Sequence, residues 1–169
     1  CGAGHKISAD STIAARTCTE CGSDEYQPAA DHRESSCMIQ PACSKGEVSS
    51  AKSIETIRTC TACPSNTYMN VDVHTETTCK AQPLCRAGQW FEGNLTDRTA
   101  AGACTLCAEG TYQNATNHRE SACKQQAQCA AGTWLNATAR TVGACAPCGE
   151  NEFQDAAEHR EVACKAQST

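Results

Sequence analysis

The chain has 169 residues, a net charge of −5 and 16 cysteines, but only two tryptophans, three tyrosines and two phenylalanines. So few large apolar side chains exclude a globular domain with one large hydrophobic core. Lysine and arginine form no run, which argues against nucleic acid as a partner. No apolar stretch approaches the roughly 18 residues of a membrane span, so we expect neither a signal peptide nor membrane insertion within this segment.

The cysteines follow one order four times: a cysteine, a long loop, a Cys-x-x-Cys pair, a second long loop, a cysteine and a five-residue spacer. Such a period predicts a tandem array in which each unit contacts mainly its neighbours. The four units, called repeats 1 to 4 below, are residues 1–42, 43–84, 85–128 and 129–169.

Only one of the two loops changes length between repeats. The second loop, called the constant loop, always encloses 15 residues, whereas the first, the variable loop, encloses 16, 16, 18 and 15 residues. A bridge spanning both loops would tie their lengths together, so each loop is expected to close on itself. The predicted disulfides are Cys1–Cys18, Cys21–Cys37, Cys43–Cys60, Cys63–Cys79, Cys85–Cys104, Cys107–Cys123, Cys129–Cys145 and Cys148–Cys164. The alternative is an interlaced scheme such as Cys18–Cys37 with Cys21–Cys43.

These bridges are expected to replace a hydrophobic core. One bridge closing a loop of this size contributes roughly 3 kcal/mol, so two per repeat give about 6 kcal/mol. Such cysteine usage persists only in an oxidising setting, which predicts an extracellular or cell-surface location reached through the secretory pathway. Three Asn-x-Thr sequons are candidate N-glycosylation sites in that setting: Asn94, Asn114 and Asn136.

Other side chains recur as strictly as the cysteines. Each constant loop carries an aromatic residue, expected to lie on the cystine. It also carries a histidine followed by a glutamate, and the histidine is expected to make either a surface contact or a local hydrogen bond. Each variable loop carries a glycine where a turn calls for positive φ. The aromatic residues are Tyr26, Tyr68, Tyr112 and Phe153, the histidines His32, His74, His118 and His159, and the glycines Gly4, Gly46, Gly88 and Gly132.

The variable loops fall into two subtypes. Repeats 1 and 2 end this loop with Arg-Thr-Cys, whereas repeats 3 and 4 end it with Gly-Ala-Cys and carry Trp90 and Trp134. Each tryptophan is either a contact residue for a partner, as expected of exposed aromatic side chains, or a cover for the cystine of its own repeat.

No enzyme, metal or cofactor signature competes with this scheme. Successive Cys-x-x-Cys pairs lie about 40 residues apart, whereas a zinc ribbon places its pairs about 15 to 20 apart. A thioredoxin-like site needs one pair on a βαβ scaffold, which the sequence does not predict. We therefore predict no catalytic residue, no metal ligand set and no cofactor.

The cysteine order, together with the Gly-Thr-Tyr-Gln element at Gly110–Gln113, resembles the cysteine-rich repeats of the tumour necrosis factor receptor superfamily over the whole chain. The resemblance implies that the constant loop is an A-type module with one bridge. The variable loop would be a B-type module reduced from two bridges to one. The implied fold class is small and disulfide-rich, an elongated, solenoid-like tandem array of short β-turn and β-strand modules with almost no helix. No ligand-binding residue can be carried over, since no family-wide binding motif matches.

We predict a non-catalytic extracellular repeat rod with a structural or adhesive role, as a filament, coat or surface stalk. Because the sequence begins on Cys1 and stops after a fourth five-residue spacer, it is expected to be a segment of a longer tandem array. Its partners would be other protein chains or further copies of its own repeats, with N-glycans attached. The alternative is the ectodomain of a tumour necrosis factor receptor-like cell-surface receptor that binds a protein ligand.

Overall fold

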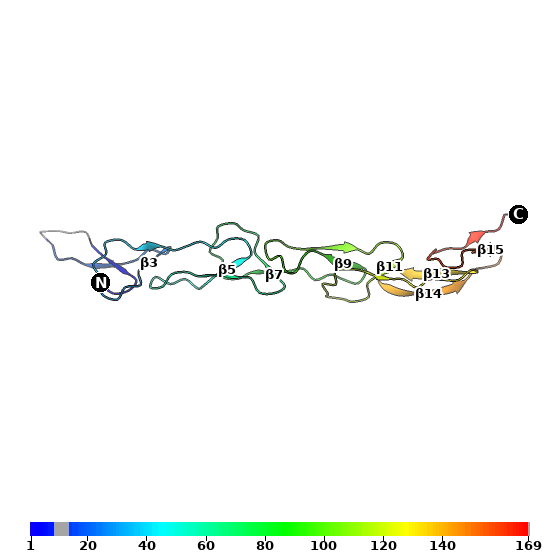
Figure 1. Ribbon diagram of the computed structural model, residues 1–169, viewed down its shortest axis with the longest axis horizontal. Helices are drawn as coiled ribbons and strands as arrows, with labels where there is room; N and C mark the ends of the chain where they lie inside the picture. Colours follow the sequence, from blue (N-terminus) through cyan, green and yellow to red (C-terminus); the bar gives the residue numbers. More distant parts are fainter. Residues whose placement is uncertain (9–13, 169) are drawn as a thin grey trace. The chain divides into compact units, whose positions relative to one another are not determined.

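The computed structural model describes residues 1–8 and 14–168; residues 9–13 of repeat 1 and Thr169 of repeat 4 lie outside the described residues. The regular elements of the described chain are short strands, each paired antiparallel with one other strand (Figure 1). The variable loops hold β1 (His5–Ile7) with β2 (Cys18–Glu20), β5 (Glu47–Ser49) with β6 (Cys60–Ala62), β9 (Gln89–Glu92) with β10 (Ala103–Leu106), and β13 (Thr133–Thr138) with β14 (Thr141–Pro147). The constant loops hold β3 (Glu25–Tyr26) with β4 (Met38–Ile39), β7 (Thr67–Tyr68) with β8 (Lys80–Ala81), β11 (Thr111–Tyr112) with β12 (Lys124–Gln125), and β15 (Glu152–Phe153) with β16 (Lys165–Ala166).

This architecture is the small disulfide-rich tandem array of strand and turn modules that the sequence predicts. Within the described part, no helix is both long and apolar enough to cross a membrane.

A glycine with positive φ begins each variable-loop hairpin, as predicted. In repeat 2, Gly46 has φ 77°, a conformation that only glycine adopts without strain. Its N–H donates to the carbonyl oxygen of Met69 at 2.9 Å, and its own carbonyl accepts the N–H of Cys63 at 2.8 Å. One glycine thus ties the variable loop to the constant loop of its repeat. The same φ region holds Gly4, Gly88 and Gly132.

All 16 cysteines are bridged, each within its own loop. The bridges are Cys1–Cys18, Cys21–Cys37, Cys43–Cys60, Cys63–Cys79, Cys85–Cys104, Cys107–Cys123, Cys129–Cys145 and Cys148–Cys164. Their Cα–Cα distances run from 5.4 to 5.9 Å, as in ordinary disulfides. Cys43, Cys85 and Cys129 are almost fully buried, so cystines form much of the interior.

The aromatic residue of the constant loop is not its most buried side chain. The tyrosines are half-buried and Phe153 is exposed, and the ammonium groups of Lys124 and Lys165 lie near the rings of Tyr112 and Phe153. The buried position is the next one along the chain, where the four repeats place Gln27, Met69, Gln113 and Gln154. In repeats 3 and 4 the aromatic ring therefore lies under a lysine ammonium group while its neighbour along the chain fills the interior.

The two variable-loop subtypes differ in how they fill one interior position. In repeat 3 the buried ring of Phe91 lies against Gly102, and in repeat 4 the buried Leu135 lies against Gly143. In repeat 2 the matching positions hold the small Ser49 and the large Arg58. A large side chain on one strand is thus matched by a small one opposite.

The described chain divides into two compact units, and each is treated separately below. Unit 1 comprises Cys1–Gln82 with Leu95–Ala101, and unit 2 comprises Pro83–Asn94 with Gly102–Thr169. The tip of the variable loop of repeat 3 therefore belongs to the compact unit that holds repeats 1 and 2.

Candidate functional site

An apolar groove lies beside the second cystine in repeat 3. The lining residues are Trp90, Ala108, Thr111, Ser121, Ala122 and Cys123, around a volume of about 300 Å³ that is open to solvent. Trp90 stands on β9 opposite Thr105 of β10. Because side chains alternate along a strand, Trp90 faces the groove while its neighbour Phe91 is buried inside the repeat.

The same groove recurs in repeat 2. Its lining residues are Val48, Pro64, Thr67, Thr77, Thr78 and Cys79, around a volume of about 260 Å³. Each lies at the position that its counterpart occupies in repeat 3, so Val48 stands where Trp90 does. Neither lining includes a charged side chain. Each groove offers methyl groups, cystine sulfur and threonine hydroxyls, which suit an apolar or aromatic side chain of another protein.

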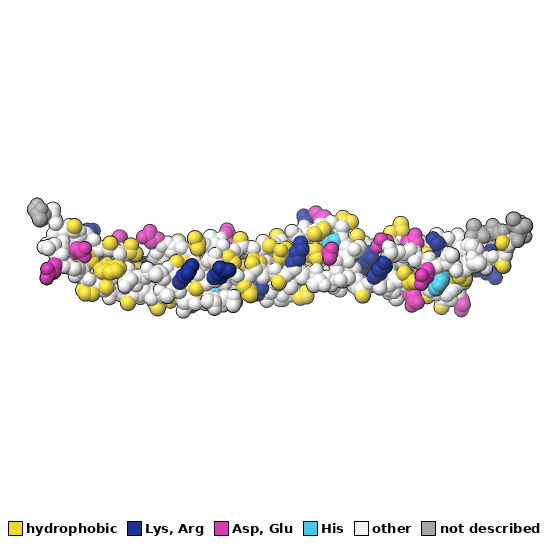
Figure 2. Space-filling view, turned by 180° about the vertical axis from the view of Figure 1, so that it is seen from behind, with side chains coloured by type: hydrophobic (Ala, Val, Ile, Leu, Met, Phe, Trp, Pro, Cys, Tyr) yellow, Lys and Arg dark blue, Asp and Glu magenta, His cyan; other side chains and the backbone are white. Residues whose placement is uncertain are grey.

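The two predicted contact residues differ in their surroundings. Trp90 is half-buried and lines the same groove as Cys123, so part of its side chain remains accessible to a partner. Trp134 is also half-buried, on β13 opposite Ala146, but lines neither of these grooves. Hydrophobic side chains are scattered over the face shown in Figure 2, with no continuous band.

Each constant-loop histidine is held by two backbone groups of its own repeat. In repeat 2, Nδ1 of His74 accepts the N–H of Glu76 at 3.1 Å, so the ring proton lies on Nε2. Nε2 lies 3.0 Å from the carbonyl oxygen of Ser44 and donates to it. The backbone N–H of each of His74 and Cys43 also donates to the carbonyl oxygen of the other, which joins the constant loop to the start of the repeat. The same contacts recur at His32, His118 and His159.

Within the described residues, one group of metal-type side chains lies close together, and it is Cys43, Glu47 and Cys60. The two sulfurs of this group form a disulfide with each other, so they are not thiolate ligands. The donor set that remains is a single carboxylate, which does not make a metal site.

Two exposed carboxylates have pKa values lowered by hydrogen bonds. The pKa of Asp97 is lowered because the Thr99 hydroxyl, and then the Thr99 backbone N–H, donate to its carboxylate. The pKa of Asp155 is lowered chiefly by the hydrogen bond from Lys165. Both groups stay ionised at neutral pH and act as local ties.

The three sequon asparagines are exposed. Asn136 lies on β13 opposite Ala144, Asn94 follows β9, and Asn114 follows β11 and accepts a hydrogen bond from Lys124. Exposure is the property that a glycan acceptor needs. The three sites remain predicted sites.

A buried glutamine that the sequence analysis does not single out makes one of the contacts between successive repeats. Nε2 of Gln40 donates to the carbonyl oxygens of Ser53 (2.7 Å) and Thr56 (3.0 Å). Its Oε1 accepts the N–H of Arg58 at 2.6 Å. Gln40 sits third in the spacer of repeat 1, and its three partners belong to the variable loop of repeat 2, so one side chain fastens that loop.

The same arrangement recurs at Gln126 in the spacer of repeat 3. Its Nε2 donates to the carbonyl oxygens of Thr138 and Thr141, and its Oε1 accepts the N–H of Gly143. Gln82 in the spacer of repeat 2 donates to the carbonyl oxygen of Ala100 at 2.9 Å. We call Gln40, Gln82 and Gln126 the clasp glutamines, and residues 53–56, 98–100 and 138–141 the loop tips that they hold.

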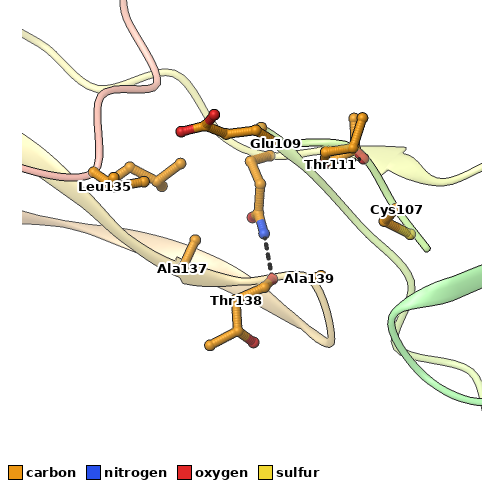
Figure 3. A pocket seen from close by; sticks show the side chains of 11 residues that line it. Cys107, Glu109, Thr111, Leu135, Ala137, Thr138 and Ala139 are labelled. Atoms are coloured by element: carbon orange, nitrogen blue, oxygen red, sulfur yellow. Dashed lines mark hydrogen bonds between the residues drawn. The ribbon is translucent and has the colours of Figure 1, made fainter.

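A second bond at each loop tip comes from the buried position of the constant loop. The backbone N–H groups of Gln27, Met69 and Gln113 donate to the carbonyl oxygens of Ile54, Arg98 and Ala139 respectively. Figure 3 shows the small pocket of about 140 Å³ at the tip of repeat 4, with Leu135, Ala137, Thr138 and Ala139 on one side and Cys107, Glu109 and Thr111 on the other. The dashed line there marks the hydrogen bond to the Thr138 carbonyl. The signal for these contacts was present in the sequence, because every five-residue spacer has glutamine third.

Comparison with known proteins gives little beyond this geometry. No family model matches the sequence, and no curated protein matches it. Among solved structures, a chain of the mouse RANKL–OPG complex aligns at 20% identity over 79% of this chain and 96% of that one, with a TM-score of 0.35. A chain of the human RANKL/OPG complex aligns at 20% identity over 80% of each chain, also at 0.35. A TM-score this low does not define a shared fold, so neither complex identifies a ligand for this chain.

Proposed function

We propose that this chain is a protein-binding segment of an extracellular, receptor-type ectodomain built from cysteine-rich repeats. The observation that carries the proposal is the open apolar groove found at the same positions in repeats 2 and 3, walled by Val48 and Trp90. An uncharged apolar recess with a half-buried tryptophan is the kind of surface at which protein partners place their anchoring side chains. The resemblance of the cysteine order to tumour necrosis factor receptor repeats agrees with this function.

The partner is expected to be a protein with apolar or aromatic side chains on its contact surface. The ring of Trp90, the methyl groups of Ala108 and Ala122 and the sulfur of Cys123 give such side chains contact area. The hydroxyl of Thr111 donates to the carbonyl oxygen of Ala108 at 2.7 Å, so at the rim its oxygen can only accept a hydrogen bond. A net charge of −5 without basic runs favours a protein over nucleic acid.

We propose no catalytic activity. Every cysteine is bridged, so no thiolate is available as a nucleophile. Each constant-loop histidine uses both ring nitrogens on backbone groups, as His74 does with Glu76 and Ser44, so none is free to act as a general base.

We propose that residues 1–42, 43–84, 85–128 and 129–169 are the structural modules of the array. Each segment contains two complete disulfides, and no bridge crosses a boundary. With no free thiol, the proposed site of action is outside the cell or at its surface.

A structural or adhesive role is the second candidate, and the clasp glutamines favour it. They show that the chain devotes buried side chains to fastening one repeat to the next. A purely structural rod, however, needs only these contacts and leaves the recurring grooves without a role. We therefore place protein binding first.

The test is a binding screen of the secreted, fully oxidised chain against an array of purified cell-surface and secreted proteins. Partners are then retested with Trp90→Ser, Val48→Ser and the control Leu106→Ser. Leu106 is 72% exposed and lies outside both grooves, so its loss removes surface hydrophobicity without altering a groove. Thermal unfolding and disulfide mapping verify that each variant is folded.

A groove residue that anchors a partner is expected to weaken binding at least about tenfold when replaced, which corresponds to about 1.4 kcal/mol. Leu106→Ser should leave the affinity unchanged. If a partner binds all three variants as tightly as the native chain, the grooves are not the binding site. If no partner is found and native material forms fibres, the structural role replaces protein binding.

A further inference from the structure

Repeats 1 to 3 each present the same three groups to a loop tip: a positive-φ glycine, the N–H of the buried constant-loop residue, and a clasp glutamine. In repeat 1 these are Gly4, Gln27 and Gln40. A Cβ built on Gly4 would lie 3.0 Å from the side chain of Ile54, so the tip packs directly on the glycine. The glycines of repeats 2 and 3 are covered in the same way, Gly46 by Thr99 and Gly88 by Arg140. All three glycines are buried.

Repeat 4 carries the same three groups, at Gly132, Gln154 and Gln167. The backbone places them as in the other repeats. Gly132 has φ 80°, and its N–H donates to the carbonyl oxygen of Gln154. The backbone N–H of Gln167 donates to the carbonyl oxygen of Asn151. In repeat 1 the corresponding bonds run from Gly4 to Gln27 and from Gln40 to Asp24. The framework that orients the three groups is therefore already formed.

Among the described residues, no loop tip lies on these groups. A Cβ on Gly132 would meet no atom within 4 Å, and Gly132 is exposed where its three counterparts are buried. Gln167 is exposed, whereas the clasp glutamines are at most 7% exposed. The openness of Gly132 and the exposure of Gln167 thus mark one face of repeat 4. We call it the end face and define it by Gly132, Gln167 and the backbone N–H of Gln154, whose side chain is itself buried.

We propose that the end face is a docking surface for the variable-loop tip of another cysteine-rich repeat. The occupant is defined by the tips seen on repeats 1 and 3. It offers two carbonyl oxygens to the Gln167 amide, one N–H to the Gln167 carbonyl oxygen, and one further carbonyl to the Gln154 N–H. None of these hydrogen-bonding groups is charged, so this part of the recognition depends on the spacing of main-chain groups.

The proposal is tested by adding a copy of residues 129–169 directly after Thr169, which preserves the spacer. Amide hydrogen exchange by NMR then follows the backbone N–H of Gln154 and the side-chain amide of Gln167. The native chain is the baseline, and Gln113 and Gln126 in the same molecule report an occupied face. In the extended chain, we expect exchange of the Gln154 N–H to slow by about tenfold or more, toward the rate of Gln113.

Gln167→Ala in the extended chain should return the Gln154 N–H to its rate in the native chain. Gln125→Ala is the matched control, because Gln125 is an exposed spacer glutamine without a tip contact and should change nothing. Disulfide mapping shows whether the added repeat is folded. A second extended chain, which carries a copy of residues 43–84 instead, repeats the test in case the first added repeat does not fold. If either added repeat forms its own two bridges while Gln154 exchanges as in the native chain, the proposal is overturned.

Discussion

Gly102 lies directly against the ring of Phe91: a Cβ atom at position 102 would come within 2.2 Å of the ring carbon Cζ. Phe91 lies on β9 and is 1% exposed, and Gly102 immediately precedes β10, the partner strand of the same hairpin. A hydrogen atom at position 102 is therefore what allows a phenylalanine to fill the interior of repeat 3, where cysteine is the only other buried hydrophobic residue among those described.

Gly102→Ala should destabilise unit 2. The methyl group forces the ring of Phe91 or the hairpin backbone to shift, and overpacking of this kind costs about 1 to 3 kcal/mol. Thermal unfolding with the disulfides intact is the measurement. Gly149→Ala is the control, since a Cβ there would meet only the mobile end of Glu152, at 3.4 Å. Equal melting temperatures for the two variants would contradict the packing described here.

Gln126→Ala should weaken the attachment of the loop tip of repeat 4. The change removes three hydrogen bonds, two of them to the carbonyl oxygens of Thr138 and Thr141. At about 1 kcal/mol for each bond, the loss is roughly 3 kcal/mol. Hydrogen exchange at Gly143 should accelerate accordingly, while Gln125→Ala, one residue earlier and exposed, serves as the comparison. If hydrogen exchange at Gly143 is unchanged in Gln126→Ala, Gln126 does not hold the loop tip.

Asp97 should titrate below its ordinary value of 3.8, because the hydroxyl and N–H of Thr99 donate to the carboxylate. A lowered pKa in the folded state means that the contribution to stability is present above 3.8 and is lost as pH falls through the folded-state pKa. Carbon NMR of the carboxyl group measures the titration. Thr99→Val should raise the pKa of Asp97 toward 3.8. A midpoint already at 3.8 in the native chain would show that the hydrogen bonds do not form.

Cleavage after glutamate without reduction distinguishes the two pairing schemes. Because cuts follow Glu20, Glu25 and Glu34, pairing within loops leaves residues 1–20 as one internally bridged peptide. Residues 21–25 stay crosslinked to residues 35–47 in either scheme, because that peptide carries both Cys37 and Cys43. The free peptide 1–20, identified by mass spectrometry, is therefore the product that decides. A crosslink between residues 1–20 and the Cys37 peptide would establish the interlaced scheme instead.

Expression through a eukaryotic secretory route should add glycans at Asn94, Asn114 and Asn136, whose side chains are exposed. Peptide mass mapping before and after enzymatic removal of N-glycans locates them. The corresponding threonine-to-alanine change in each sequon should abolish that site alone. Absence of a glycan from all three asparagines in such material would refute the prediction.

Much of the fold could be predicted because it depends on spacing. The fixed length of one loop per repeat indicated closure within each loop, and the glycine three residues after each first cysteine indicated a turn of positive φ, which Gly46 and its counterparts adopt. These features are local, and local constraints leave a clear trace in a repeated sequence.

The contacts between repeats could not be predicted in the same way. A clasp glutamine such as Gln40 is visible in the spacer, but its acceptors are backbone carbonyls, which every residue possesses. The groove beside Trp90 likewise depends on small residues such as Ala108 and Ser121, whose types alone do not indicate a recess. That the residue after the constant-loop aromatic is the buried one was also not predicted, because in three of the four repeats it is a polar glutamine.

The clasp glutamines have a consequence for how such a chain can diverge. Gln40 holds a tip containing Ser53 and Thr56, whereas Gln126 holds one containing Thr138 and Thr141, and in both cases it is the peptide groups that are gripped. Side-chain substitutions at the tip therefore leave these hydrogen bonds in place. Variable loops of 16 and 15 residues, in repeats 2 and 4, are bound by the same set of hydrogen bonds. After a repeat is duplicated, the exposed side chains of each copy can be substituted and so acquire new binding partners. The glutamine contacts between neighbouring repeats are kept.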